Sequence, residues 1–151
     1  MKDTTLCYVE QNGKYLMLYR NKKKNDVNGG KYVGIGGHVE KGETPTQCII
    51  REAYEEAGLT LHTPRYRGIV TFISNIYEDE HMHLFTCDDF SSELIECNEG
   101  ELSWIEKSNL DKIPMWEGDY IFLDMLTKRE GFFKLRLEYE GDTLVKSTIE
   151  D

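Results

Sequence analysis

Apolar and polar residues alternate most clearly near the C-terminal end of the chain. Over residues 133–139, four apolar side chains are separated by charged ones, and this period of two predicts a half-buried strand. Gly141-Asp142 predicts a turn into a returning strand over 143–149. Comparable patterns predict strands over 5–10, 14–20, 65–74, 81–87 and 102–105, and a glycine-interrupted extended segment over 32–37. Asn12-Gly13 predicts a hairpin between the first two strands.

Two segments carry the signals of helices. Thr44 is a good N-cap, Pro45 suits the first helical position, and Gln47 completes a capping box, so a helix is predicted over 45–57. Gly58 is typical of the residue that ends such a helix. Apolar residues at helical spacing predict a second helix over 119–129, with Asp119 as a possible N-cap.

Mixed strands with two helices predict an α+β protein with helices on both sides of a central sheet, an α/β/α sandwich. A length of 151 residues, without an internal repeat or a low-complexity tract, predicts one domain over 1–151.

Three carboxylates gather on one face of the first predicted helix. At about 100° per residue, Glu52, Glu55 and Glu56 lie within roughly 100° of one another, and apolar residues occupy the opposite arc. Like charges at this spacing destabilise a helix slightly, whereas hard oxygen ligands suit Mg²⁺ bound together with phosphates. The alternative is a solvated acidic helix face. Gly37, Glu43, Arg51 and Gly58 stand in register with the glutamates and favour the metal site.

Residues 37–59, GHVEKGETPTQCIIREAYEEAGL, resemble the Nudix box, and all seven of its fixed positions match. The resemblance implies a Nudix fold and divalent metal, Mg²⁺ with Mn²⁺ as a substitute. Glu55 and Glu56 are then the expected metal ligands, and Glu52 either binds metal or takes a proton from the attacking water. Arg51 is expected to pair with Glu43 or Glu55 and hold this geometry. The resemblance also implies that the backbone carbonyl of Gly36 and a later acidic residue bind metal; Glu99 matches best, and Glu96 and Glu101 are competitors.

The resemblance extends beyond the box to MutT-type 8-oxo-dGTP diphosphatases. It rests on residues 30–37, on Asn98-Glu99 before Leu102-Ser-Trp104, and on Met115-Trp116-Glu-Gly-Asp119. It implies that Trp116 stacks on a purine and that Asp119 hydrogen-bonds the edge of the base. The competing interpretations are a core position for Trp116 and a capping role for Asp119.

Three further residues are expected at the base or the phosphates. Phe72 would form another wall of the base pocket. Lys23 would reach the triphosphate or the pocket mouth, unless its loop is only a solvated basic segment. Val33 stands where the mammalian branch of the family has an asparagine that binds the base, so the choice between oxidised and ordinary guanine is open.

Composition narrows the classes of partner. A net charge of −10 argues against a nucleic-acid polymer and suggests that a cation mediates any contact with a polyphosphate. No apolar run reaches membrane-spanning length and no signal peptide is evident, so no membrane partner is expected. Four cysteines without CxxC spacing indicate free thiols and a cytoplasmic protein. The expected assembly is a monomer or a homodimer.

The sequence therefore predicts a Mg²⁺-dependent hydrolase that converts 8-oxo-dGTP or a related oxidised purine nucleotide to the monophosphate and pyrophosphate. The alternatives are a Nudix hydrolase of a dinucleoside polyphosphate, a nucleotide sugar or an RNA 5′ end. A non-catalytic nucleotide sensor and a structural protein that merely retains the fold are further alternatives.

Overall fold

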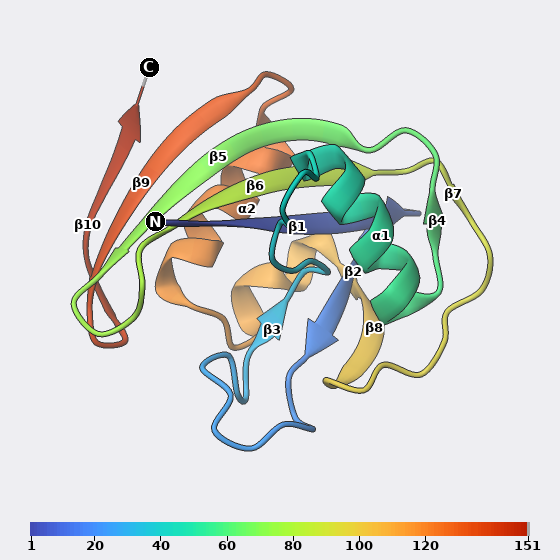
Figure 1. Cartoon of the computed structure of the whole chain (residues 1–151), viewed down its shortest axis with the longest axis horizontal. Coiled ribbons are helices and arrows are strands. Elements are labelled where there is room, and N and C mark those ends of the chain that lie inside the picture. Colours follow the sequence, from blue (N-terminus) through green and yellow to red (C-terminus); the bar gives the residue numbers. More distant parts are fainter. Residues whose placement is uncertain (151) are drawn as a thin grey trace.

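A computed structural model describes residues 1–150 (Figure 1). The strands are β1 (Lys2–Gln11), β2 (Lys14–Tyr19), β3 (Tyr32–Val33), β4 (Thr60–Leu61), β5 (Arg65–Ser74), β6 (Glu80–Cys87), β7 (Phe90–Ser91), β8 (Glu101–Glu106), β9 (Phe133–Glu140) and β10 (Thr143–Glu150). The helices are α1 (Pro45–Ala57), the 3₁₀ helix η1 (Lys107–Lys112) and α2 (Glu117–Lys128).

The main sheet is mixed. Its order is β10-β9-β5-β6-β1-β2-β3, with β8 paired to β2. β1 runs parallel to β6 and β5 runs parallel to β9, whereas the other neighbours are antiparallel. Strands β4 and β7 form a separate small pair.

Helices α1 and α2 cover opposite faces of the sheet, because alternate residues of β1 pack into two different cores. Cys7 and Val9 of β1 join Ile49 and Ala53 of α1 in one cluster. Leu6 and Tyr8 join the α2 side chains in the other. The predicted sheet with a helix on each face is therefore confirmed (Figure 1).

Strands β1 and β2 diverge, and this creates room for a site. They pair only near their hairpin, at Glu10 with Tyr15 and at Gln11 with Lys14. Toward the N-terminal end of β1, away from the hairpin, the segment after β3 takes the place of β2: Cys7 bridges to Ile35, and Thr4 bridges to His38. The loop that leads into α1 is thereby fixed beside the open part of the sheet.

The second helix differs from its prediction in a way that matters for the site. It begins at Glu117, and the N-cap position belongs to Trp116, which makes no side-chain cap hydrogen bond. Asp119 is therefore not the N-cap: it lies in the first helical turn, and its side chain is buried rather than turned back toward the helix end. The helix starts early because its first residues are fixed against the sheet. The Trp116 ring meets the Tyr139 ring edge-to-face, and the Gly118 N–H donates a hydrogen bond to the Tyr139 hydroxyl.

The 3₁₀ helix η1 and the strand pair of β4 and β7 were not predicted, because each of these elements is too short to give a periodic signal. All four cysteines, at positions 7, 48, 87 and 97, are buried free thiols. Within residues 1–150, none of the helices combines the length and the apolar character that crossing a membrane requires.

Candidate active site

Helix α1 is held at both ends by the interactions that its sequence predicts. Thr44 Oγ1 accepts a hydrogen bond from the Gln47 backbone N–H at 3.1 Å, and Thr44 N–H donates to Gln47 Oε1 at 2.9 Å. At the other end, Gly58 adopts a left-handed conformation with φ of 73°, and its N–H donates to the carbonyl of Tyr54. The direction of the acidic face is therefore set locally by the chain itself.

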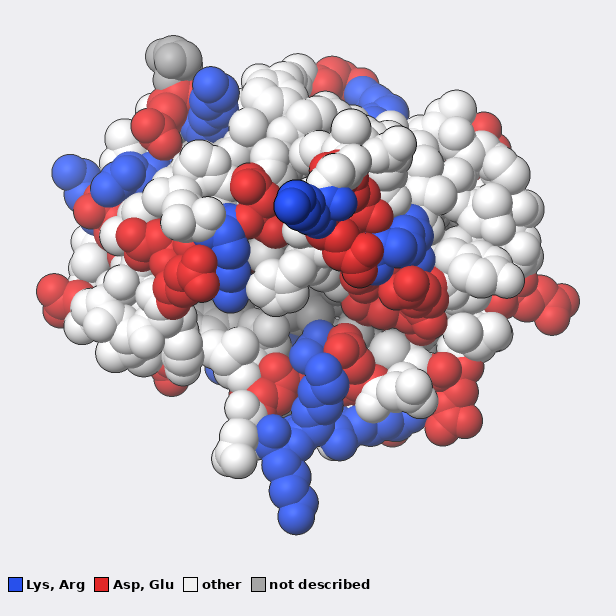
Figure 2. Space-filling view, viewed as in Figure 1, with Lys and Arg blue, Asp and Glu red and all other residues white. Residues whose placement is uncertain are grey.

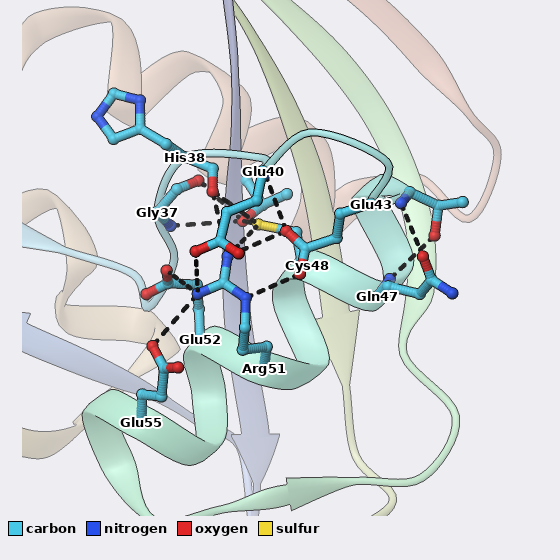
Figure 3. A network of polar contacts seen from close by, with 11 residues as sticks. Gly37, His38, Glu40, Glu43, Gln47, Cys48, Arg51, Glu52 and Glu55 are labelled. Carbon is cyan, nitrogen blue, oxygen red and sulfur yellow. Dashed lines mark hydrogen bonds and ion pairs between the residues drawn. The ribbon is translucent and has the colours of Figure 1, made fainter.

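Arg51 lies at the centre of a polar network that joins α1 to the preceding loop (Figure 3). Its Nε and Nη2 atoms donate to the two carboxylate oxygens of Glu43 at 2.8 and 3.0 Å. Its Nη1 donates to Glu52 at 2.8 Å and to Glu55 at 3.2 Å, and Nη2 also donates to the His38 carbonyl. The hydrogen bonds from Arg51 lower the pKa of Glu43 to about 2. Arg51 thus pairs with both of the partners considered for it.

Gly37 is required by the position of Glu52. A Cβ atom at residue 37 would lie 2.6 Å from the Glu52 carboxyl carbon, which is closer than real contacts allow. The glycine that begins the sequence pattern therefore lets a carboxylate of α1 approach the loop backbone. A side chain at this position would push the Glu52 carboxylate out of place.

The open part of the sheet contains a cavity with a volume of about 540 Å³, a size typical of sites for small ligands. Figure 2 shows a hollow near the middle of this face, with carboxylates gathered on the α1 side and cationic side chains on the loop between β2 and β3. Glu52 and Glu56 of α1, Glu99 of the segment before β8, and Gly36 all line the cavity. Residues from distant parts of the sequence therefore meet at one acidic end.

Glu56 is the most perturbed carboxyl group at this end. Burial raises its pKa well above the ordinary value, and the nearby charges of Glu99 and Glu52 raise it further. A bound divalent cation would relieve this repulsion, so the donor set fits such an ion. Among residues 1–150, no three His, Cys, Asp or Glu side chains are grouped closely enough to hold a metal ion by themselves.

The other acidic candidates occupy different positions. The Glu55 side chain is 56% exposed and lies outside the cavity lining, where Arg51 holds it. Glu99 accepts hydrogen bonds from Arg20 at 2.9 Å and from Lys23 at 2.8 Å, so Lys23 also lies at the cavity. Glu96, the competitor of Glu99, has an 89% exposed side chain. Glu101 is also exposed, and neither competitor lines the cavity.

The opposite end of the cavity is aromatic and apolar. Trp116 and Phe72 line it with their rings in an edge-to-face arrangement, and Val33 contributes an aliphatic wall. Trp116 also meets the ring of Tyr139 edge-to-face, and its Nε1 donates to Asn28 Oδ1 at 2.8 Å. The indole is 7% exposed, so it is a core residue and a cavity wall at once.

Asp119 supplies a buried acid beside this wall. It lines the cavity and is 8% exposed. Burial raises its pKa to about 8, the charge of Glu80 adds to this effect, and the charge of Lys31 opposes it. At neutral pH Asp119 is therefore mostly a neutral carboxylic acid, which both donates and accepts hydrogen bonds.

The raised pKa predicts how Asp119→Asn changes stability with pH. Between about pH 3.8, the ordinary pKa of an aspartate, and about pH 8, the native state holds a proton that the unfolded state has lost, so wild-type stability falls as pH rises through this window. Asparagine has no proton to lose. The stability advantage of the variant is expected to grow with pH by on the order of 1 kcal/mol per unit, and to level off above about pH 8.

Urea unfolding of both proteins, without metal, at several pH values from about 6 to 9 measures this difference. The range avoids the isoelectric point of about 4.9. The raised pKa of Glu56 also makes stability fall as pH rises, but it does so in both proteins, so the difference between them cancels this contribution. A difference that stays constant over the range would show that the Asp119 pKa is not raised.

Several lining residues were not predicted from the sequence. Arg20, Asp26 and Asn28 belong to a polar loop without periodicity, and Glu80 lies at the start of a strand. The cluster of charged and amide side chains between two strands was the only available signal, and it does not distinguish a cavity wall from a solvated loop.

Comparison with known proteins decides the family. The NUDIX domain model matches residues 2–126, which is most of the chain. The chain belongs to the Nudix hydrolases. An oxidized purine nucleoside triphosphate hydrolase of Danio rerio is 35% identical, with 97% of this chain and 93% of the relative covered. The uncharacterized Nudix hydrolase YvcI of Bacillus subtilis is 29% identical, with 87% and 82% covered.

The Nudix fold is confirmed by a solved structure. The MutT protein from Bacillus halodurans superimposes with a TM-score of 0.89 over 99% of this chain and 98% of that one, at 22% identity. At this identity the likeness shows the fold, and the match to the NUDIX domain model shows the family.

Proposed function

We propose that this Nudix hydrolase cleaves 8-oxo-dGTP, or a related oxidised purine nucleoside triphosphate, to the monophosphate and pyrophosphate with the aid of Mg²⁺, and thereby cleans the nucleotide pool. One observation carries the proposal: a single cavity has clustered carboxylates at one end and an indole with a buried acid at the other. The name of the Danio rerio relative is consistent with this substrate class.

At the acidic end, Glu52, Glu56, Glu99 and the Gly36 carbonyl would hold the ion, whereas Glu55, the other expected ligand, lies outside the cavity lining beside Arg51. The ion would neutralise phosphate charge and polarise the phosphorus that is attacked. Arg51 keeps Glu52 and Glu55 in place through direct hydrogen bonds. Lys23 is positioned to exchange its pairing with Glu99 for a phosphate oxygen.

The attacking water must lose a proton as its oxygen bonds to phosphorus. Among the carboxylates that line the cavity, Glu52 and Glu56 of α1 are the proposed acceptors. We infer attack at the β-phosphorus: the new P–O bond forms there, the bond to the bridging α–β oxygen breaks, and the monophosphate leaves. Hydrolysis in ¹⁸O water would then place the label in pyrophosphate, whereas attack at the α-phosphorus would place it in the monophosphate.

At the aromatic end, the Trp116 face would stack on the purine, with Phe72 and Val33 as walls. Stacking of this kind accepts any base and contributes about 1–3 kcal/mol. Discrimination must therefore come from polar contacts, and the neutral Asp119 acid would supply both a donor and an acceptor to the base edge.

Steady-state kinetics with product analysis tests the proposal. The panel contains 8-oxo-dGTP, dGTP, a diadenosine polyphosphate and a nucleotide sugar, each with Mg²⁺, with Mn²⁺ and with EDTA. The expected result is the highest kcat/KM for 8-oxo-dGTP, pyrophosphate as the product, and no turnover in EDTA. Equal turnover of dGTP or of the diadenosine compound would refute the substrate assignment, and tight binding without hydrolysis would favour a nucleotide sensor.

A further inference from the structure

One loop contacts both ends of the cavity. Residues 20–31 leave β2 and return to β3, and the loop is closed by backbone hydrogen bonds between Arg20 and Lys31 and between Gly30 and Arg20. Its side chains face the acidic end through Arg20 and the aromatic end through Asn28. The loop is therefore in contact with side chains at both ends of the cavity and can fix their positions relative to each other.

The contacts form a continuous chain of hydrogen bonds. Arg20 Nη1 donates to Glu99 at 2.9 Å, and Arg20 Nε donates to Asp26 Oδ2 at 2.8 Å. The other carboxylate oxygen of Asp26 accepts the Asn28 backbone N–H at 3.1 Å. Asn28 Oδ1 then accepts the Trp116 Nε1–H at 2.8 Å. Each link is of ordinary hydrogen-bond length, and the chain spans from an expected metal ligand to the expected stacking surface.

Burial makes the middle of this chain stiff. The Asp26 side chain is 6% exposed and that of Arg20 is 14% exposed, so their ion pair is largely shielded from water. Removing Asp26 would leave Arg20 shielded from water with Glu99 as its remaining carboxylate partner. Lys31, in the same loop, places its ammonium 4.7 Å from the centre of the Trp116 ring and adds a second hold on the indole.

We propose that Asp26 and Asn28 are positioning residues that tie the orientation of Trp116 to the placement of Glu99, so that this loop matches the base end of the cavity to its phosphate end. The proposal rests on the proposed function for its kinetic consequences. Its structural part concerns only contacts within the protein, and a measurement that needs no turnover tests that part separately.

Fluorescence of Trp116 gives this measurement. The chain has two tryptophans, and Trp104→Phe leaves Trp116 as the only one. In that background, without metal or nucleotide, Asn28→Ala is expected to shift the emission to longer wavelength and to increase quenching by acrylamide. Asp26→Asn is expected to do the same, although Asp26 does not touch the indole. Asn21→Ala, with an exposed side chain in the same loop, is the control and should change neither.

Kinetics separates positioning from mere folding. Asn28→Ala should raise KM for the nucleotide about three- to tenfold with kcat within about twofold, because one hydrogen bond to the stacking residue is lost. Asn28→Asp keeps an oxygen that accepts the Trp116 Nε1–H, so its KM should lie close to that of the wild type. Asp26→Asn should raise KM and also lower kcat about tenfold, since Arg20 no longer holds Glu99 as it does now.

The decisive outcome is the response of Trp116 to Asp26→Asn. If the emission and quenching of Asp26→Asn match those of the Asn21→Ala control while Asn28→Ala changes both, then Asn28 holds the indole without help from Asp26, and the proposed coupling is wrong. If all variants respond as expected but no nucleotide is hydrolysed, the loop coupling stands and the proposed function fails. Thermal melts of each variant confirm that the native state is measured.

Discussion

Glu56→Gln is expected to lower kcat by about 10²- to 10⁴-fold and, at the same time, to make the protein more stable. The loss of activity follows because glutamine binds a divalent ion weakly and accepts no proton. The gain in stability follows because burial and the charges of Glu99 and Glu52 disfavour ionised Glu56 in the folded state. Each kcal/mol recovered would raise Tm by about 2–4 °C in a protein of this size.

The control for this prediction is Glu96→Gln, which makes the same change in charge in the segment that precedes Glu99. Its side chain is 89% exposed, so both kcat and Tm should stay close to wild type. Calorimetry or a thermal melt with and without Mg²⁺ completes the test, since Mg²⁺ should stabilise wild type more than Glu56→Gln. Loss of activity together with loss of stability would show that Glu56 supports the fold rather than the reaction.

The acidic end of the site could be predicted from the sequence because it is built locally. Thr44, Gln47 and Gly58 fix the ends of α1, and helical spacing then fixes which glutamates share a face. The pairing of Arg51 with Glu43 spans eight residues of one loop and helix. Even so, spacing alone did not separate Glu56, which is half-buried and lines the cavity, from Glu55, which lies outside the lining, because their difference depends on what the rest of the chain places nearby.

The aromatic end could be predicted only in part, because tertiary packing builds it. Asp119 is an acceptable N-cap by its residue type, but contacts of Trp116 with the sheet move the start of α2 to Glu117 and turn Asp119 into the cavity. Asn28 and Trp116 are 88 residues apart, and no local pattern links them. The resemblance to a known family indicated Trp116, Asp119 and Phe72, whereas the polar loop that contains Arg20, Asp26 and Asn28 carried no signal that distinguished a cavity wall from a solvated segment.

Trp116→Ala is expected to raise KM for the purine nucleotide about 10- to 100-fold while kcat falls far less. The loss of base stacking, worth about 1–3 kcal/mol, weakens binding of the ground state and of the transition state alike, and this changes KM rather than kcat. Trp116→Phe keeps an aromatic face and should recover most of the binding. Initial rates over a range of nucleotide concentrations, at saturating Mg²⁺, measure both constants.

A buried indole also supports the fold, so the effect on KM must be separated from a loss of stability. Truncating a buried tryptophan costs about 3–5 kcal/mol, and assays must be run well below the lowered Tm. Trp104→Ala is the control, because Trp104 is half-buried, stacks on Phe90 against the core beside α1 and does not line the cavity. A smaller fall in Tm with an unchanged KM is expected for Trp104→Ala. If Trp116→Ala also left KM unchanged, Trp116 would be a core residue alone, and the base would have to bind elsewhere in the cavity.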